Sequence, residues 1–145
     1  DYLRRLGASE ILSREETEAE SARPLGAERW AGSIDTVGGA TLAYLMRTTK
    51  TGGGIAAIGV AGGAAFRATV YPLILRGVMV LGIDMPSTPL EVRRELWEEV
   101  IQEASLLGLV DLMVSEVTLE DIPRVTQAML GGQTRGRILV RPNEL

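Results

Sequence analysis

The 145-residue sequence has no cysteine and no histidine, and aromatic residues make up only 4% of it. A chain without cysteine forms no disulfide and offers no thiolate to a metal or a substrate. A chain without histidine lacks the commonest metal ligand and the commonest general base near neutral pH. If the protein is an enzyme, we therefore expect its reactive group to come from a bound cofactor.

Long apolar runs are also absent. No run approaches the roughly 20 residues that a membrane span requires, and the start does not resemble a signal peptide. The net charge of −4 and the pI of about 4.9 provide no long-range attraction to nucleic acid or to an anionic membrane. We expect a cytoplasmic protein with no nucleic acid, membrane or metal partner, in which local groups hold any phosphate ligand.

A strand, helix, strand unit occupies the centre of the sequence. Residues 32–37 and 55–60 are short apolar runs between turn residues, which is typical of strands buried on both faces. Residues 40–46 carry leucine and methionine at helical spacing, as the crossover between parallel strands requires. The turns at 36–39 and 59–63 contain glycine, and ligands of open parallel sheets bind where such strands end.

The remaining sequence continues this alternation. The patterns predict a helix end at 1–7, strands at 9–12, 78–83, 112–117 and 137–140, and helices at 71–76, 88–104 and 118–130. They also predict a turn at 13–16 and a loop with at most one helical turn at 16–28. Thr88 with Glu91, and Thr118 with Asp121, are predicted to cap the last two helices. With 46% hydrophobic residues, the sequence predicts one α/β domain over residues 1–145, built on a doubly wound parallel sheet.

Two motifs favour a structural role over a chemical one. Residues 52–57 match the pattern G-x-G-x-x-A, but a dinucleotide fingerprint follows a strand and opens a helix. These glycines precede a strand, which favours a tight helix-to-strand turn, and no other stretch qualifies as a pyrophosphate loop. Asp35 resembles a catalytic carboxylate, but its place before a helix favours capping of backbone amides.

Two arginines leave alternatives open. Arg14 follows the predicted strand at 9–12, and Arg137 ends the run Thr134-Arg-Gly-Arg137 just before the last strand. Each is either a solvated surface charge or a phosphate contact. The planar guanidinium suits phosphate oxygens, so the two arginines could meet one phosphate from two sides. Their spacing alone does not decide between these interpretations.

Six blocks occur in an order that is typical of one protein family. They are Leu6-Gly-Ala-Ser9, Trp30-Ala-Gly with Ile34-Asp-Thr-Val-Gly38, Gly59-Val-Ala-Gly-Gly63, Tyr71-Pro-Leu-Ile-Leu-Arg76, Leu81-Gly-Ile-Asp84 and Arg135-Gly-Arg137. Together they resemble the acryloyl-CoA reductase (NADPH) branch of the quinone-oxidoreductase-like, zinc-free medium-chain dehydrogenase/reductase superfamily. The resemblance runs from Asp1 to about Val140. It implies a Rossmann-type domain, NADPH as hydride donor, an enoyl-CoA such as acryloyl-CoA as acceptor, and a dimer joined near Ile83.

The resemblance also implies cofactor contacts at particular residues. Arg14 would contact the adenosine 2′-phosphate, which favours NADPH over NADH, and Thr36 would lie near the adenosine ribose. Val60 and Ile74 would line the nicotinamide side, and Arg137 would contact the cofactor from the final strand.

One further cofactor-binding position departs from the family. Met85 follows Asp84, where the family usually has serine. The polar contact of the family is therefore not expected at Met85.

The resembling enzymes carry two parts that this sequence does not match. A substrate-binding barrel and the strand with the glycine fingerprint come before this region in the family. We therefore expect a carboxyl-terminal part of a reductase, a partial Rossmann-type sheet that is inactive alone, with the enoyl-CoA bound through the missing amino-terminal domain and no catalytic residue in this chain. The alternatives are a quinone or enone reductase of the same superfamily, and a non-catalytic binding or dimerisation module.

Overall fold

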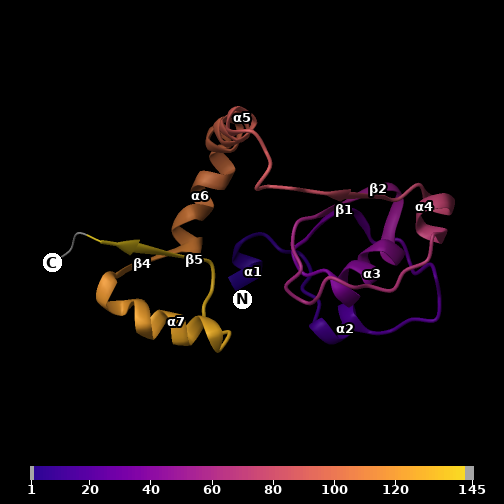
Figure 1. Cartoon of the computed structure of the whole chain (residues 1–145), viewed down its shortest axis with the longest axis horizontal. Coiled ribbons are helices and arrows are strands. Elements are labelled where there is room, and N and C mark those ends of the chain that lie inside the picture. The colour runs from indigo at the N-terminus through magenta and orange to yellow at the C-terminus, as the bar shows by residue number, and fades with distance from the viewer. Residues whose placement is uncertain (1, 143–145) are drawn as a thin grey trace. The chain divides into compact units, whose positions relative to one another are not determined.

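The computed structural model describes residues 2–142, apart from the side chains of residues 104–107 (Figure 1). The contacts divide the chain into two compact units, Leu12–Thr88 and the combination of Asp1–Ile11 with Pro89–Leu145. The single nucleotide-binding domain over residues 1–145 stays a prediction.

The unit Leu12–Thr88 contains a three-stranded parallel sheet. Its elements are α2 (Arg14–Glu18), β1 (Trp30–Asp35), α3 (Gly39–Thr48), β2 (Thr49–Ala57), α4 (Tyr71–Arg76) and β3 (Met79–Gly82). The strand order is β1-β2-β3, with Ser33 paired to Ile55 and Ile55 paired to Val80. The predicted strand, helix, strand unit is confirmed.

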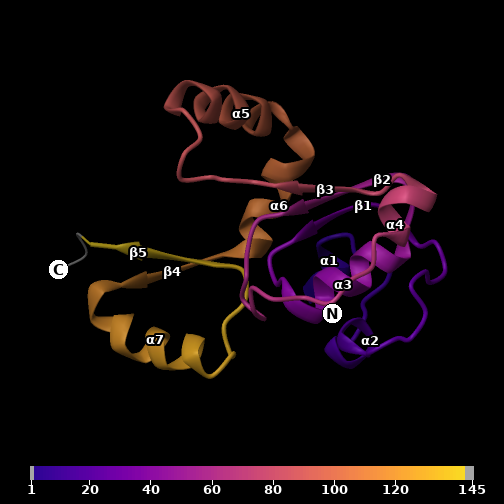
Figure 2. The ribbon, with the colours of Figure 1, turned by 45° about the vertical axis from the view of Figure 1, so that its right-hand side comes forward.

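Helix α3 buries its apolar side against this sheet (Figure 2). Leu42 and Met46 pack with Ile55 of β2 and with Val78, and Ile55 is fully buried. The other face of the sheet differs, because Ile34 of β1 is 74% exposed. Burial of apolar surface, the main stabilising contribution, is therefore concentrated on the α3 side.

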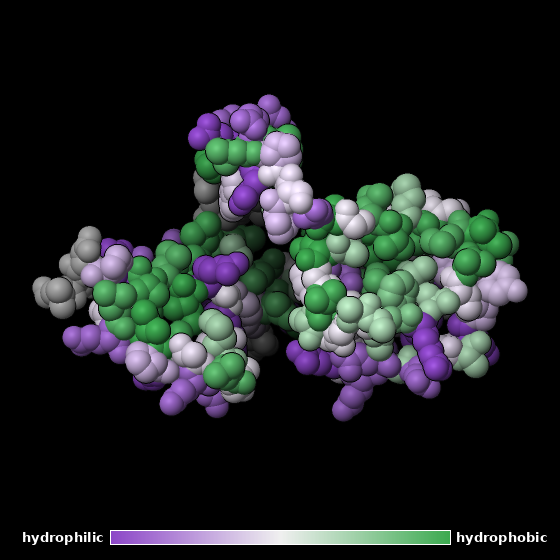
Figure 3. All heavy atoms as spheres, in the orientation of Figure 1, coloured by the Kyte–Doolittle hydropathy of each residue, from purple (hydrophilic) through white to green (hydrophobic). Residues whose placement is uncertain are grey.

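The second unit contains a two-stranded parallel sheet. Its elements are α1 (Tyr2–Arg5), α5 (Leu90–Gln102), α6 (Ala104–Met113), β4 (Val114–Thr118), the 3₁₀ helix η1 (Leu119–Asp121), α7 (Ile122–Leu130) and β5 (Arg137–Arg141). Strands β4 and β5 pair from Val114–Arg137 to Thr118–Arg141. Figure 3 shows hydrophobic residues gathered on the surface of this unit, and Leu130 is 85% exposed. The parallel α/β class is confirmed, with the described strands shared between two sheets.

The predicted strand at residues 9–12 is wrong. These residues form no strand, because no strand in the described part of the chain pairs with them. Residues 14–18 form α2, so the helical turn allowed in the loop at 16–28 begins earlier, within the predicted turn at 13–16. Ser13 caps it: the Glu16 amide donates to the Ser13 hydroxyl at 3.2 Å, and the Ser13 amide donates to the Glu16 carboxylate at 2.7 Å. This capping box explains why a polar stretch becomes helical.

The two predicted caps of later helices have different outcomes. The Thr88 capping box is wrong, because Pro89 is the N-cap of α5 and the Thr88 hydroxyl donates to the Asp84 carbonyl at 2.9 Å. The Thr118 and Asp121 capping box is confirmed, although it opens η1 just ahead of α7.

Residues 52–54 have a structural role, as expected, but the predicted tight helix-to-strand turn is wrong. They lie inside β2, where the pairing shifts from Trp30–Thr49 to Gly32–Gly54. A side chain on Gly53 would come within 2.6 Å of the Ala31 carbonyl oxygen. The glycines therefore allow a close strand contact at an irregularity and do not open a helix.

Candidate functional site at the carboxyl edge of the sheet

Asp35 organises the turn between β1 and α3. Its side chain is 1% exposed, and it accepts hydrogen bonds from the amides of Val37 at 3.1 Å and Gly38 at 3.0 and 3.1 Å. These amides lie just before the positive end of α3, where a carboxylate is favoured. The predicted capping role of Asp35 is confirmed, and its oxygens face backbone amides rather than a ligand.

The two glycine turns meet in backbone contact. The amides of Ala61 and Gly62, in the turn after β2, donate to the carbonyls of Thr36 and Val37 at 3.3 and 2.7 Å. A side chain on Gly38 would lie 2.5 Å from the Gly63 carbonyl oxygen. Two turns that are distant in the sequence therefore form one narrow shelf of backbone at the carboxyl ends of β1 and β2.

The structure brings two predicted cofactor residues to this shelf. Thr36 is exposed, and its carbonyl accepts the Ala61 amide next to Val60. Val60 is 64% exposed, so its apolar side chain is available to a flat ring. A shelf without bulky side chains, bordered by a hydroxyl and an apolar group, suits close approach of an extended ligand.

Two more predicted residues belong to the same unit. Met85 follows the end of β3, where the Ile83 amide donates to the Ala57 carbonyl at 3.0 Å, and it is 47% exposed. Ile74 lies on α4 and is 68% exposed. The predicted roles of both residues at the cofactor stay predictions.

The two candidate phosphate arginines fall in different units. Arg14 is the first residue of α2, and Arg137 is the first residue of β5; both are exposed. The hypothesis that they meet one phosphate stays a prediction. Among the described residues, no group of three or more acidic, histidine or cysteine side chains could hold a metal ion. In the same part of the chain, no helix is long and apolar enough to cross a membrane.

The sequence patterns did not reveal the anchoring role of Arg76, at the end of α4. Its guanidinium donates to the carbonyls of Gly26 at 2.7 Å and Arg47 at 3.0 Å, and its Nε lies 3.6 Å from Glu28. The side chain is 13% exposed. Arg76 therefore joins α4 to the loop before β1 and to the end of α3, and a single arginine in an apolar helix carries no signal for such distant partners.

Comparisons with known proteins agree with the family resemblance. No protein-family model matches the chain. Acrylyl-CoA reductase AcuI of Ruegeria pomeroyi is 43% identical over 143 residues, which are 99% of this chain and 43% of the relative. YhfP of Bacillus subtilis, which carries the name of a quinone oxidoreductase, is 40% identical over 97% of this chain and 43% of its own length. The chain thus spans less than half the length of these relatives.

Solved structures of related proteins also match the fold of this chain. YhdH of Escherichia coli K-12, solved with bound NADPH, matches with a TM-score of 0.86 and 39% identity over 98% of this chain and 43% of that protein. YhfP of Bacillus subtilis, solved with bound NAD, matches with a TM-score of 0.84. The sequence and structure comparisons together show that this chain is homologous to part of acrylyl-CoA reductase AcuI and of YhfP, and that it shares the fold of that part.

Proposed function

We propose that the chain provides part of the cofactor site of an NADPH-dependent oxidoreductase that reduces the carbon–carbon double bond of an enoyl-CoA such as acryloyl-CoA. The observation that carries this proposal is the shelf at the carboxyl ends of β1 and β2, in a chain 43% identical to an acrylyl-CoA reductase. Relatives crystallised with NADPH and NADP support the choice of cofactor.

The residues of the shelf fit an extended dinucleotide. A side chain at Gly38 would collide with the Gly63 carbonyl oxygen, so glycine there lets the two turns of the shelf pack together. Thr36 would hydrogen-bond the adenosine ribose, and Val60 with Ile74 would line the nicotinamide. Arg14, with no acid partner among residues 2–142, would bind the 2′-phosphate by charge-assisted hydrogen bonds. Arg137 and Met85 would add contacts from β5 and from the end of β3.

NADPH supplies a hydride from its nicotinamide C4, and the proposed reaction places that hydride on the β-carbon and a proton on the α-carbon of the thioester. The residues of this chain would orient the nicotinamide and keep water from it through the apolar side chains of Val60 and Ile74. We assign no residue of this chain to the proton transfer, and the acyl-CoA contacts would come from an additional domain.

A quinone or enone is the second candidate acceptor. The identity of 40% to YhfP, with its quinone oxidoreductase name, supports it. A non-catalytic binding or dimerisation module is the third possibility, and an NADPH-binding test separates it from both reductases.

We also propose a cytoplasmic homodimer joined through β3. Within residues 2–142, this strand is paired on one side only, by β2, and its four residues Met79–Gly82 are exposed. An exposed apolar edge strand favours pairing with another copy.

The test uses the protein that its natural reading frame encodes. NADPH oxidation is measured with acryloyl-CoA and with 1,4-benzoquinone, and we expect the larger kcat/KM with acryloyl-CoA. The variant Arg14→Gln should raise the KM for NADPH about tenfold and leave that for NADH nearly unchanged, because only NADPH carries the 2′-phosphate. Faster quinone reduction would select the second candidate, and absence of NADPH binding would reject both reductases.

A further inference from the structure

Two adjoining hollows follow α3 on the side of Ala43 and Arg47, and the smaller one reaches the buried Met46. The larger has a volume of about 470 Å³ and the smaller about 60 Å³. Ser21, Ala43, Arg47 and Arg67 line both, so the hollows form one groove, here called the α3 groove. None of the predicted cofactor residues lines it. The larger hollow falls within the size range of small-molecule sites.

Three arginines converge on the α3 groove although the protein is acidic overall. Arg47 and Arg67 line its middle, and Arg23 lines its smaller part. Within residues 2–142, no hydrogen bond or ion pair engages the guanidinium of Arg23 or Arg67. Three guanidinium groups outnumber the two carboxylates that line the groove, Glu18 and Glu20, and so create a local site for an anion.

Arg47 is already fixed in place. Its Nη2 donates to the Ala19 carbonyl at 2.8 Å, and its guanidinium carbon lies 5.2 Å from the centre of the Tyr44 ring. One of its five donors is used by this bond, so the others remain available to a ligand. A preorganised guanidinium loses less conformational entropy when a ligand binds.

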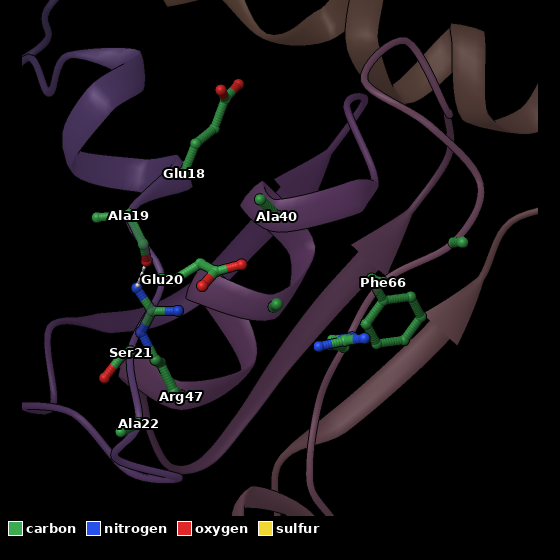
Figure 4. A pocket seen from close by; sticks show the side chains of 11 residues that line it. Glu18, Ala19, Glu20, Ser21, Ala22, Ala40, Arg47 and Phe66 are labelled. Carbon is green, nitrogen blue, oxygen red and sulfur yellow. Dashed lines mark hydrogen bonds between the residues drawn. The ribbon is translucent and has the colours of Figure 1, made fainter.

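The larger hollow of the groove also has an apolar wall. Figure 4 shows Phe66 and Arg47 on opposite sides of the hollow, with Ala40 of α3 between them. Glu18 and Glu20 line the same hollow, and Figure 4 shows the Glu20 side chain on the side of Arg47. An apolar wall can receive a ring or short hydrocarbon body, and the two carboxylates repel a second anionic group there.

We propose that the α3 groove binds a small phosphate monoester with an aromatic or short apolar body. The phosphate lies among Arg23, Arg47 and Arg67, and the body lies against Phe66 and Ala40. A dianionic phosphate matches three guanidinium groups better than a single carboxylate does, because it offers more charge and more acceptor oxygens. This site is separate from the proposed NADPH site and does not depend on it.

The test is titration calorimetry with phenyl phosphate on the protein from its natural reading frame. We expect saturable binding that is at least about tenfold tighter than binding of inorganic phosphate, because the phenyl group adds apolar burial. Arg67→Gln should weaken phenyl phosphate binding about tenfold by removing a charge-assisted contact. Since the Arg67 guanidinium has no partner among the described residues, this variant should keep the melting temperature of the unsubstituted protein.

Two control variants distinguish binding in the α3 groove from binding elsewhere on the protein. Arg94→Gln removes the same charge from α5 in the other unit, and Arg14→Gln removes it from the proposed NADPH site. Both should leave the phenyl phosphate affinity within about twofold of the original. Equal weakening by Arg67→Gln and Arg94→Gln would show general charge attraction, and weakening by Arg14→Gln alone would place the ligand at the nucleotide site. Either result, or absence of saturable binding, overturns the proposal.

Discussion

The two compact units of this chain bury their apolar residues to different degrees. The unit Leu12–Thr88 contains every buried hydrophobic residue found in the described part of the chain, including Ile55 and Val78. In the other unit, Trp97 is 62% exposed and Leu139 is 45% exposed, although both lie in regular elements. Regular secondary structure is thus present in both units, but a closed core is present in one.

This difference predicts in which unit substitutions should most affect stability and function. Variants in the unit Leu12–Thr88 should change both, because its core positions the shelf and the α3 groove. Variants in the other unit should have smaller effects on unfolding, because its side chains lose less contact area when they are truncated.

The largest expected effect is that of Ile55→Ala. The side chain of Ile55 is fully buried between α3 and the sheet, so its truncation leaves a cavity and should cost about 3 kcal/mol in free energy of unfolding. Urea unfolding measures the loss. The matched variant Leu139→Ala, on β5, should cost less than about 1 kcal/mol, because that side chain is nearly half exposed. Equal losses of unfolding free energy in the two variants would contradict the conclusion that only the unit Leu12–Thr88 has a closed core.

Gly38→Ala should come next, at about 2 kcal/mol. Gly38 has φ of +70° and ψ of −153°, a region that only glycine adopts readily, and an added Cβ would lie 2.5 Å from the Gly63 carbonyl oxygen. The displaced turn should also weaken NADPH binding, measured by fluorescence titration. Gly52→Ala provides the control: Gly52 has φ of +76° but open space around it, so a cost of about 1 kcal/mol and unchanged NADPH affinity are expected. Unchanged stability and NADPH affinity in Gly38→Ala would contradict this prediction.

Arg76→Met should also destabilise the unit, by about 2 kcal/mol. The substitution keeps much of the side-chain volume but removes the donors to the carbonyls of Gly26 and Arg47. The control Arg67→Met removes a guanidinium that has no partner in the described part of the chain and should change stability by less than about 0.5 kcal/mol. Thermal unfolding of the two variants compares them directly. If both melt alike, Arg76 does not anchor α4.

The smallest effect concerns a pair in the other unit. The guanidinium of Arg141 hydrogen-bonds Glu116 across β4 and β5, and this bond lowers the pKa of the Glu116 carboxyl from its ordinary 4.5. A lowered folded-state pKa means that the pair stabilises the fold above pH 4.5 and that this contribution disappears as the pH falls through the folded pKa.

An NMR titration of the Glu116 carboxyl tests that prediction. Arg141→Gln should move the pKa back up toward its ordinary value, while the effect on unfolding stays small because both groups are exposed to solvent. An unchanged Glu116 pKa in the variant would show that Arg141 does not cause the shift.

Much of the fold was predictable from local patterns. The central strands and α3 follow from apolar runs and helical spacing, and Asp35 was identified as a cap from its position before a helix. The strand at 9–12 was not predicted correctly, because a strand exists only when a neighbour provides hydrogen bonds, and sequence patterns do not report neighbours. The Thr88 cap failed for a related reason, since its hydroxyl found a competing acceptor at Asp84.

Some features of the candidate site were also predicted from the sequence, and others were not. The sequence by itself determined the glycine turns, the absence of cysteine and histidine chemistry, and the family to which the motifs pointed, because these depend on residue types and their order. Folding brings the turn after β1 against the turn after β2, Arg76 to Gly26, and Arg23, Arg47 and Arg67 to one groove, and none of these contacts was predicted from the sequence. The physical reason is that such contacts depend on how the chain packs, and residues far apart in sequence carry no local signal of their meeting.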